Sequence, residues 1–225
     1  MMSDPIAAVL FDLDGTLVDT APDFVRILNQ LRVDEDLSPL PYDVIRNQVS
    51  NGARALIRLG FDITDEDADF ASRLDKLLQR YEQELARESH LFAGLEQTLA
   101  LLETRNIPWG VVTNKPSRYT GPLLKGLHLE QRCAVTVCPD HVTHRKPHPE
   151  PLLTACKQLA VDPLQTIYVG DHLRDVEAGR AAGNFTVAAA WGYLTEDDDI
   201  SGWQADLIAN TPIDLLQYLQ RKLQP

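Results

Sequence analysis

Two aspartates near the N-terminus lie two positions apart, and their carboxylates could take part in covalent catalysis. They lie in the segment Asp12-Leu-Asp-Gly-Thr16, directly after an apolar run at residues 6–11. In an extended segment, side chains at i and i+2 point the same way, so we expect the carboxylates of Asp12 and Asp14 to share one site. A carboxylate can attack an electrophilic centre such as phosphorus, and a second carboxylate can carry the protons. We therefore predict Asp12 as a nucleophile and Asp14 as a general acid and base.

Polar residues also end the later apolar runs of the sequence, at residues 107–113, 134–138 and 166–169. The carboxyl ends of parallel strands meet at one edge of a sheet, so side chains that follow such strands are expected to converge there. A lone Asp, Asn or Thr after a strand can simply cap the next helix, but several sites in register favour one shared polar site. Its expected members are Asp12, Asp14, Thr113, Asn114, Lys115, Lys146, Asp171 and Asp175.

These residue types suit a reaction at phosphorus. The charge of Asp12 has to be shielded from a phosphate, and a magnesium ion held by oxygens of Asp12, Asp171 and the phosphate would do so. Thr113 and Asn114 can hydrogen-bond phosphate oxygens. Lys146 can offset the charges of the phosphate and of Asp12. Mg²⁺ is therefore the expected cofactor.

The elements that must position these residues follow from the hydrophobic pattern. The runs at residues 6–11, 107–113, 134–138, 166–169 and 185–190 are short and apolar, as in strands buried on both faces. Helical patterns alternate with them, which predicts an α/β fold with a doubly wound parallel sheet. After Trp203 we expect a short strand and a final helix, with these residues facing inward: Ile213, Leu215, Leu216 and Leu219.

Residues 19–88 carry a different pattern. No strand is predicted there, and two apolar stripes have helical spacing. One stripe comprises Phe24, Ile27, Leu28 and Leu31, and the other Phe70, Leu74, Leu77, Leu78, Tyr81 and Leu85. A helical cap inserted after the first strand is the simplest arrangement. We therefore predict a catalytic core of residues 1–18 and 89–225 and a cap domain of residues 19–88.

The composition limits the compartment and the partners. Of the 225 residues, 44% are hydrophobic, and no stretch approaches the roughly 20 apolar residues of a membrane helix. Three cysteines cannot all pair with one another, which fits a reducing compartment, and we expect a cytoplasmic protein. The net charge of −12 disfavours nucleic acid and membranes as partners. The expected partner is a small phosphorylated metabolite, with the oligomeric state open between monomer and homodimer.

The polar segments together resemble the four motifs of the haloacid dehalogenase superfamily. In order, these are Asp12-Leu-Asp-Gly-Thr16, Val112-Thr-Asn114, Lys146-Pro147 and Gly170-Asp171 through Asp175. The resemblance spans essentially the whole chain and implies a Rossmann-like core with a helical type-1 cap. It adds Gly15 to the phosphate-binding residues. It also implies magnesium ligands at Asp12, at the backbone carbonyl of Asp14 and at Asp171, with Asp175 either a ligand or one contact removed from the ion.

Members of the superfamily catalyse several different reactions, and single residues indicate which of them this chain could perform. Dehalogenases lack the second aspartate, so Asp14 argues against dehalogenation. Phosphonatases need a cap lysine for a Schiff base, and Lys76, the only lysine of the predicted cap, is expected to face solvent from an amphipathic helix. The preferred activity is a phosphomonoesterase. A β-phosphoglucomutase-type phosphomutase and a non-catalytic binding protein of the same fold stay open as alternatives.

Within the superfamily the chain resembles phosphoglycolate phosphatase-like enzymes. It resembles more closely the bacterial N-acetylmuramic acid 6-phosphate phosphatases, which serve cell-wall recycling. The closer resemblance is carried by the segments at residues 109–116, 138–142 and 170–175. Both substrates carry a carboxylate, which a guanidinium can bind with two hydrogen bonds. Arg54, after the turn signal Asn51-Gly52, is the predicted substrate-binding residue of the cap, and the alternative is an ordinary surface arginine.

One further group of side chains has metal-ligand types. Cys138, His141, His144 and His148 could suggest zinc, but their spacing matches no closed structural zinc motif. Cys138 ends an apolar run, which predicts a buried core thiol. We therefore expect no structural zinc site, and the role of His172 stays open.

Overall fold

The apolar runs of the sequence form one six-stranded parallel sheet in the computed structural model, which describes residues 5–195 and 197–224. The strand order is β5-β4-β1-β6-β7-β8, so β1 lies inside the sheet, paired on both sides. The predicted Rossmann-like α/β fold is confirmed. The strands are β1 (Ala8–Phe11), β4 (Trp109–Val112), β5 (Val135–Val137), β6 (Thr166–Gly170), β7 (Phe185–Ala189) and β8 (Leu207–Ala209).

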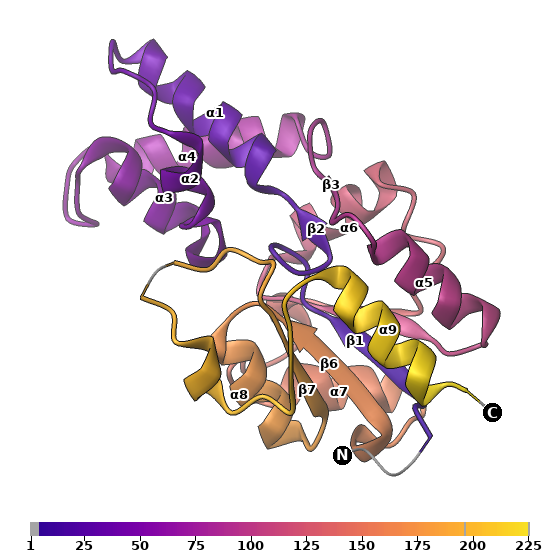
Figure 1. Ribbon diagram of the computed structural model, residues 1–225. Coiled ribbons are helices and arrows are strands. Elements are labelled where there is room, and N and C mark those ends of the chain that lie inside the picture. The colour runs from indigo at the N-terminus through magenta and orange to yellow at the C-terminus, as the bar shows by residue number, and fades with distance from the viewer. Residues whose placement is uncertain (1–4, 196, 225) are drawn as a thin grey trace. The chain divides into compact units, whose positions relative to one another are not determined.

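Helices cover both faces of this sheet (Figure 1). Leu10 of β1 and Tyr168 of β6 are buried in one cluster with side chains of α7 and α8, which also contact each other. Helices α5 and α9 pack against each other on the other side. The helices of this unit are α5 (Leu95–Thr104), α6 (Ser117–Gly126), α7 (Glu150–Leu159), α8 (Leu173–Ala182) and α9 (Pro212–Lys222), with short 3-10 turns η2 (Pro139–His141), η3 (Pro163–Gln165) and η4 (Ile200–Trp203).

The predicted final helix is present as α9, but its buried face differs in one residue from the expectation. Leu215 and Leu219 are fully buried and Leu216 is half-buried, whereas Ile213 is 43% exposed. Residues two positions apart do not share a helix face, and Leu215 and Leu219, four apart, set the buried one. The inward placement of Ile213 is therefore wrong.

The chain divides into two compact units. One comprises Met1–Val18 and Leu91–Pro225, and the other Asp19–His90. This division lies two residues beyond the cap boundary expected from the sequence. The short strands β2 (Val18–Asp19) and β3 (His90–Leu91), where the chain passes between the units, pair with each other.

The smaller unit is helical apart from the ends of β2 and β3. Its elements are α1 (Ala21–Asp34), α2 (Tyr42–Arg46), the 3-10 turn η1 (Val49–Asn51), α3 (Gly52–Phe61) and α4 (Phe70–Gln83). The apolar stripes of α1 and α4 meet, and Phe24 stacks on Tyr81 with ring centroids 4.1 Å apart. A buried carboxylate, Asp23, adds polar contacts to this core: it accepts hydrogen bonds from the backbone amides of Glu88 and Ser89 at 3.0 and 3.1 Å.

Among the described residues, no helix has the length and apolar character needed to cross a membrane.

Candidate active site

The predicted site residues of the larger unit lie at the carboxyl ends of adjacent strands. Asp12 directly follows β1, Thr113 follows β4, and Asp171 follows β6. Because β4 and β6 flank β1 in register, their ends come together at the Asp12 position. Asp12, Asp171 and Asp175 each place a carboxylate oxygen within 4.8 Å of the others, and all three residues are buried.

Lys146 connects this carboxylate group to the neighbouring strands. Its ammonium lies 2.9 Å from Asp12 Oδ1 and 2.7 Å from Asp175 Oδ1, and its side chain is fully buried. It also donates to the carbonyl of Val112 at 3.0 Å and to the hydroxyl of Tyr168 at 2.8 Å. Burial alone would lower the pKa of Lys146, but the charges of Asp12 and Asp175 outweigh it and raise the pKa. Lys146 is therefore a permanent cation.

Tyr168 joins the same network and was not anticipated from the sequence. Its hydroxyl donates to the carbonyl of Val112 at 2.9 Å and lies 3.3 Å from Asp175 Oδ1. Burial, together with the charge of Asp175, raises its pKa well above 10, so it stays a neutral phenol. The sequence indicated only that Tyr168 belongs to a strand. Nothing in the spacing of the residues shows that its hydroxyl contacts a lysine.

Asp171 is enclosed by backbone on two sides. Its Oδ1 accepts a hydrogen bond from the Thr16 hydroxyl at 2.7 Å and its Oδ2 from the Tyr193 amide at 3.0 Å. A Cβ added to Gly15 would lie 2.3 Å from Asp171 Oδ2, and one added to Gly192 would lie 2.2 Å from the Asp171 Cβ. The glycines therefore leave the space that this carboxylate occupies. Gly15 also has φ +84°, so a side chain there would be strained on both counts.

The electrostatics of Asp171 favour a bound cation. Burial, followed by the charges of Asp12 and Asp175, raises its pKa to about 7. The four carboxylates of Asp12, Asp14, Asp171 and Asp175 face two ammonium groups, those of Lys115 and Lys146. If all six groups are ionised, they carry a net charge of −2, which one divalent cation would balance. Oxygen ligands are those that hard cations such as Mg²⁺ prefer, so the donor set fits such an ion.

Asp175 is held by other groups through both of its oxygens. Oδ1 binds Lys146 and Tyr168, and Oδ2 accepts the His172 amide at 3.1 Å. Its pKa is raised by burial, against the lowering effect of Lys146. These contacts let Asp175 orient Lys146 and the loop after β6, and its place as a metal ligand or one contact removed from the ion stays a prediction.

His172 lies between the two acidic residues and is accounted for by the local fold. Its Nδ1 accepts the Arg174 amide at 3.2 Å, so it caps the start of α8. Burial, then the charge of Arg174, lowers its pKa to about 4, so the imidazole is neutral at physiological pH.

Lys115 was expected at this edge of the sheet, but the sequence assigned it no role. It follows β4 next to Thr113 and Asn114, and its ammonium lies 2.9 Å from Asp14 Oδ1, with only 7% of its side chain exposed. The Thr113 hydroxyl accepts the Lys115 amide at 3.1 Å, which fixes the start of this loop. The signal was its position at a strand end, but the direction of a long side chain is not readable from the sequence.

Asn114 lies in the same loop and reaches the Lys146 segment. Its side-chain amide donates to the Lys146 carbonyl at 3.1 Å. Its Oδ1 is buried and has no hydrogen-bond partner among the described residues. Asn114 therefore ties the second and third sequence motifs together, and its phosphate contact stays a prediction.

Arg54 belongs to the helical unit, in α3. Its guanidinium donates to Asp65 at 2.6 Å, and the same carboxylate accepts two hydrogen bonds from Arg58. It also lies 4.8 Å from the centroid of the Phe70 ring. The side chain is 55% exposed. Its predicted substrate contact stays a prediction.

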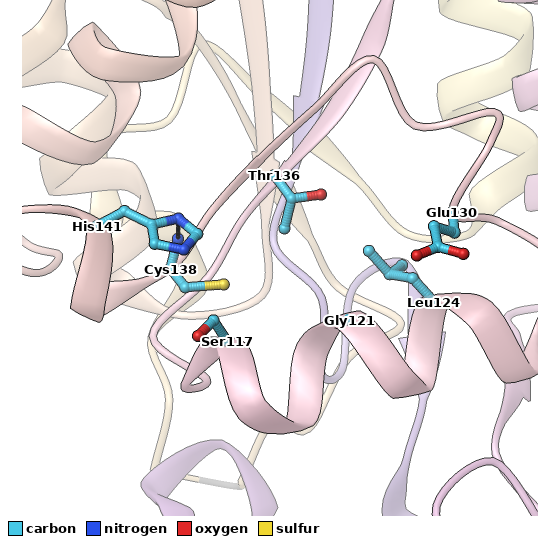
Figure 2. A pocket seen from close by; sticks show the side chains of 7 residues that line it. All are labelled: Ser117, Gly121, Leu124, Glu130, Thr136, Cys138 and His141. Atoms are coloured by element: carbon cyan, nitrogen blue, oxygen red, sulfur yellow. Dashed lines mark hydrogen bonds between the residues drawn. The ribbon is translucent and has the colours of Figure 1, made fainter.

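Cys138 and His141 line a small hollow between α6 and β5 (Figure 2). Figure 2 shows their side chains near Ser117 at the start of α6. His141 Nδ1 accepts the Cys138 amide at 3.2 Å, and the thiol is buried. Burial raises the pKa of Cys138 to about 11, as expected for an inert core thiol. His141 and Cys138 are not part of the group that His144 forms with His148 and Glu150.

Residues 9–189 match the family described as haloacid dehalogenase-like hydrolase. The chain belongs to this family. The resemblance inferred from the four motifs is thereby confirmed, and the protein is a hydrolase-family enzyme of α/β fold.

Curated members of the haloacid dehalogenase-like family are similar over nearly the whole chain. An N-acetylmuramic acid 6-phosphate phosphatase of Pseudomonas putida is 42% identical, over 97% of this chain and 98% of its own length. The protein of the same name from Pseudomonas aeruginosa is 43% identical, over 97% and 96%. A phosphoglycolate phosphatase of Xanthomonas campestris is 43% identical, over 92% and 94%.

Solved structures of the family share the fold. The crystal structure of a protein from Haemophilus somnus, described as a predicted phosphoglycolate phosphatase, superposes with a TM-score of 0.83 at 26% identity. It covers 97% of this chain, and all of its own chain is matched. Both units of the present chain therefore have counterparts in one solved protein.

Proposed function

We propose that this enzyme is a Mg²⁺-dependent phosphomonoesterase that forms an aspartyl-phosphate at Asp12. The observation that carries the proposal is the buried group of Asp12, Asp171 and Lys146 at the ends of adjacent strands, in a chain 42–43% identical to curated phosphatases. Asp12 Oδ1 already accepts the Leu13 amide at 2.7 Å and Lys146 at 2.9 Å. Oδ2 is therefore the oxygen that we assign to the attack on phosphorus.

The reaction would proceed in two steps. Asp12 Oδ2 attacks phosphorus, the bond from phosphorus to the ester oxygen breaks, and Asp14 gives its proton to the leaving oxygen. Asp14, now a carboxylate, takes a proton from water, which attacks the phosphoryl group and releases inorganic phosphate from Asp12. Lys146 stabilises the charge on Asp12 in both steps. Thr113 and Asn114 orient the phosphate oxygens.

Asp12, Asp171 and the backbone carbonyl of Asp14 are the proposed ligands of Mg²⁺. The ion would shield the carboxylates from the incoming phosphate and neutralise charge that develops on its oxygens. The excess of negative charge at this site supports the assignment, and burial of the carboxylates of Asp12, Asp171 and Asp175 explains why they need a countercharge.

Asp12→Asn tests the nucleophile. It keeps the shape of the side chain and removes the charge, so we expect metal-dependent hydrolysis of p-nitrophenyl phosphate to disappear while the circular dichroism spectrum is unchanged. The wild-type enzyme with and without Mg²⁺ is the reference. Retained turnover in the variant would remove Asp12 from its role. No metal-dependent turnover in the wild type would instead support the alternative of a non-catalytic binding protein.

The proposed substrate is N-acetylmuramic acid 6-phosphate, with phosphoglycolate as the second candidate. Two relatives named for the first activity align over 97% of the chain, and a relative named for the second aligns over 92% at similar identity. We propose to compare kcat/KM on both compounds, on glucose 6-phosphate and on β-glucose 1-phosphate. A preference for phosphoglycolate would reverse the order of the candidates. Formation of glucose 6-phosphate from β-glucose 1-phosphate would indicate a phosphomutase.

Arg54 is the proposed carboxylate-binding residue, and the chain offers a matched control. Arg58 binds the same Asp65 carboxylate and is similarly exposed. If Arg54 binds the substrate, Arg54→Ala should raise KM for N-acetylmuramic acid 6-phosphate but not for N-acetylglucosamine 6-phosphate, which lacks the lactyl carboxylate. Arg58→Ala should change neither. Equal effects of the two variants would assign Arg54 to the ion pair alone.

A further inference from the structure

The segment that carries Lys146 presents a second group of metal-ligand side chains on its opposite, exposed side. His144, His148 and Glu150 place ligand atoms within 4.8 Å of one another. Their side chains are 61%, 50% and 29% exposed, whereas that of Lys146 is buried. None of the three takes part in the network around Asp12 described above. The group is therefore a separate site.

Two distances within this group lie on either side of the distance between two ligands of a tetrahedral zinc ion. His144 Nδ1 lies 2.9 Å and His148 Nδ1 lies 3.9 Å from the same oxygen, Glu150 Oε2. Ligands at zinc distances of about 2.0–2.2 Å are about 3.3–3.5 Å apart in a tetrahedron, and the two observed distances bracket this value. The imidazole rings are already adjacent, with centroids 4.5 Å apart.

The local fold holds the carboxylate and one imidazole ready. Glu150 accepts the amides of Thr143 and His144, each at 2.9 Å, so its side chain is fixed across the loop. His148 Nδ1 accepts the Glu150 amide at 3.2 Å, which orients the ring and leaves the proton on Nε2, and a metal bound at Nδ1 would replace this hydrogen bond. Such preorganisation reduces the entropy that binding must overcome.

We propose that His144, His148 and Glu150 bind a borderline divalent transition-metal ion, with Zn²⁺ as the probe. Two imidazoles and a carboxylate suit Zn²⁺ better than Mg²⁺, which prefers oxygen alone. The fourth position faces solvent and would hold water. This differs from a closed structural zinc site, which the sequence argues against, because it has three protein ligands and includes neither Cys138 nor His141. His144, Arg145 and His148 line one surface hollow, and the charge of Arg145 works against a cation there.

The test is isothermal titration of the full-length enzyme with Zn²⁺ in the presence of excess Mg²⁺, which occupies the acidic site. We expect one zinc site in the wild type, and an affinity about 10-fold or more weaker in both His144→Ala and His148→Ala. His141→Ala, which removes an exposed imidazole from the same stretch of chain, is the matched control and should bind as the wild type does. Thermal melts establish that each variant is folded.

The spectrum of bound Co²⁺ supplies a second readout. Four-coordinate Co²⁺ with nitrogen and oxygen ligands absorbs visible light far more strongly than six-coordinate Co²⁺. We expect this absorption in the wild type and in His141→Ala, and its loss in the His144→Ala, His148→Ala double variant. Equal zinc affinity of the wild type and the double variant, or no zinc binding by the wild type, would overturn the proposal.

Discussion

At the scale of single residues, the candidate site depends on two lysines with different surroundings. Lys146 is fully buried between Asp12 and Asp175, and their charges keep it protonated. Its ammonium is thus a countercharge and not a proton donor. Lys115 binds Asp14, the residue to which we assign the proton transfers. A cation at this place holds the Asp14 carboxylate in one orientation, so Lys115 is expected to act on the reaction through Asp14.

Lys115→Met should therefore lower kcat. The methionine has about the volume of the lysine's aliphatic part but no charge. Asp14 therefore loses its ion pair with Lys115 and the orientation that this ion pair gives it. We expect kcat to decrease by about 10- to 100-fold. This is less than the loss expected when a general acid and base is removed altogether. Steady-state kinetics with p-nitrophenyl phosphate measure it. Lys125→Met, an exposed position in the last turn of α6, is the control and should leave kcat unchanged. A kcat equal to that of the wild type in Lys115→Met would contradict the assignment.

The three thiols provide a pH-dependent prediction at the same scale. Burial raises the pKa of Cys138 to about 11 and also raises those of Cys133 and Cys156. A raised thiol pKa means less thiolate at a given pH, and for Cys138 about 0.1% is ionised at pH 8. The native enzyme should therefore react slowly with Ellman's reagent at pH 8. After denaturation, all three thiols should react at once. Rapid reaction of one thiol in the native protein would show that it is not buried.

At the scale of elements, Asp23 of α1 binds the segment at Glu88 and Ser89, through which the chain leaves the helical unit. Its carboxylate is fully buried in α1 and accepts hydrogen bonds from the amides of Glu88 and Ser89 and, at 2.5 Å, from the Ser89 hydroxyl. Arg26 supplies the opposite charge at 2.9 Å. A buried carboxylate with these partners joins segments 65 and 66 residues apart in the sequence.

Asp23→Asn should destabilise the protein by about 2–4 kcal/mol. The substitution replaces an acceptor oxygen with an NH₂ group, which then faces donors, and it removes the charge opposite Arg26. The free energy of unfolding in urea measures the effect. Asp75→Asn, an exposed position within α4, should change it by less than about 0.5 kcal/mol. Similar values for the two variants would mean that the Asp23 contacts contribute little.

At the scale of the whole molecule, a net charge of −12 has to coexist with a phosphate-binding site. The fold meets this requirement locally, since two lysines and a carboxylate group suited to a divalent ion lie at one sheet edge. In the metal-free protein, the buried carboxylate of Asp171 lowers the stability of the fold at high pH. The folded-state pKa of Asp171 is raised to about 7 by burial, so its stabilising contribution is complete below the unfolded pKa near 3.8. It is lost as the pH rises through 7.

Asp171→Asn should therefore stabilise the metal-free protein at pH 8 while it abolishes metal-dependent activity. The asparagine can accept from the Tyr193 amide and donate to the Thr16 hydroxyl, so its hydrogen bonds are satisfied. We expect Tm to rise by about 2–4 °C in EDTA at pH 8 and by less at pH 5. Mg²⁺ should raise Tm in the wild type but not in the variant. A lower metal-free Tm in the variant at pH 8 would contradict this account.

The strand that carries Asp12, the α/β class and the positions of Thr113 and Asp171 could all be predicted from the sequence. Apolar runs that end in polar residues mark buried parallel strands, and such strands bring their carboxyl ends together whatever the details of packing. The position of Lys146 at this edge was predicted in the same way, because its motif follows a strand in the expected order.

The contacts of these side chains could not be predicted in this way, because they depend on the folded chain. Lys115 and Tyr168 have long side chains, and their partners Asp14 and Lys146 are distant in the sequence, so no local pattern shows the pairing. Ile213 is apolar, yet the packing of Leu215 and Leu219 leaves it exposed. The histidines of the zinc proposal were visible in the sequence, but Glu150 joined them only through the turn that follows Lys146. Periodicity reports which face of an element is buried, whereas the contacts of a polar tip depend on the three-dimensional path of the whole chain.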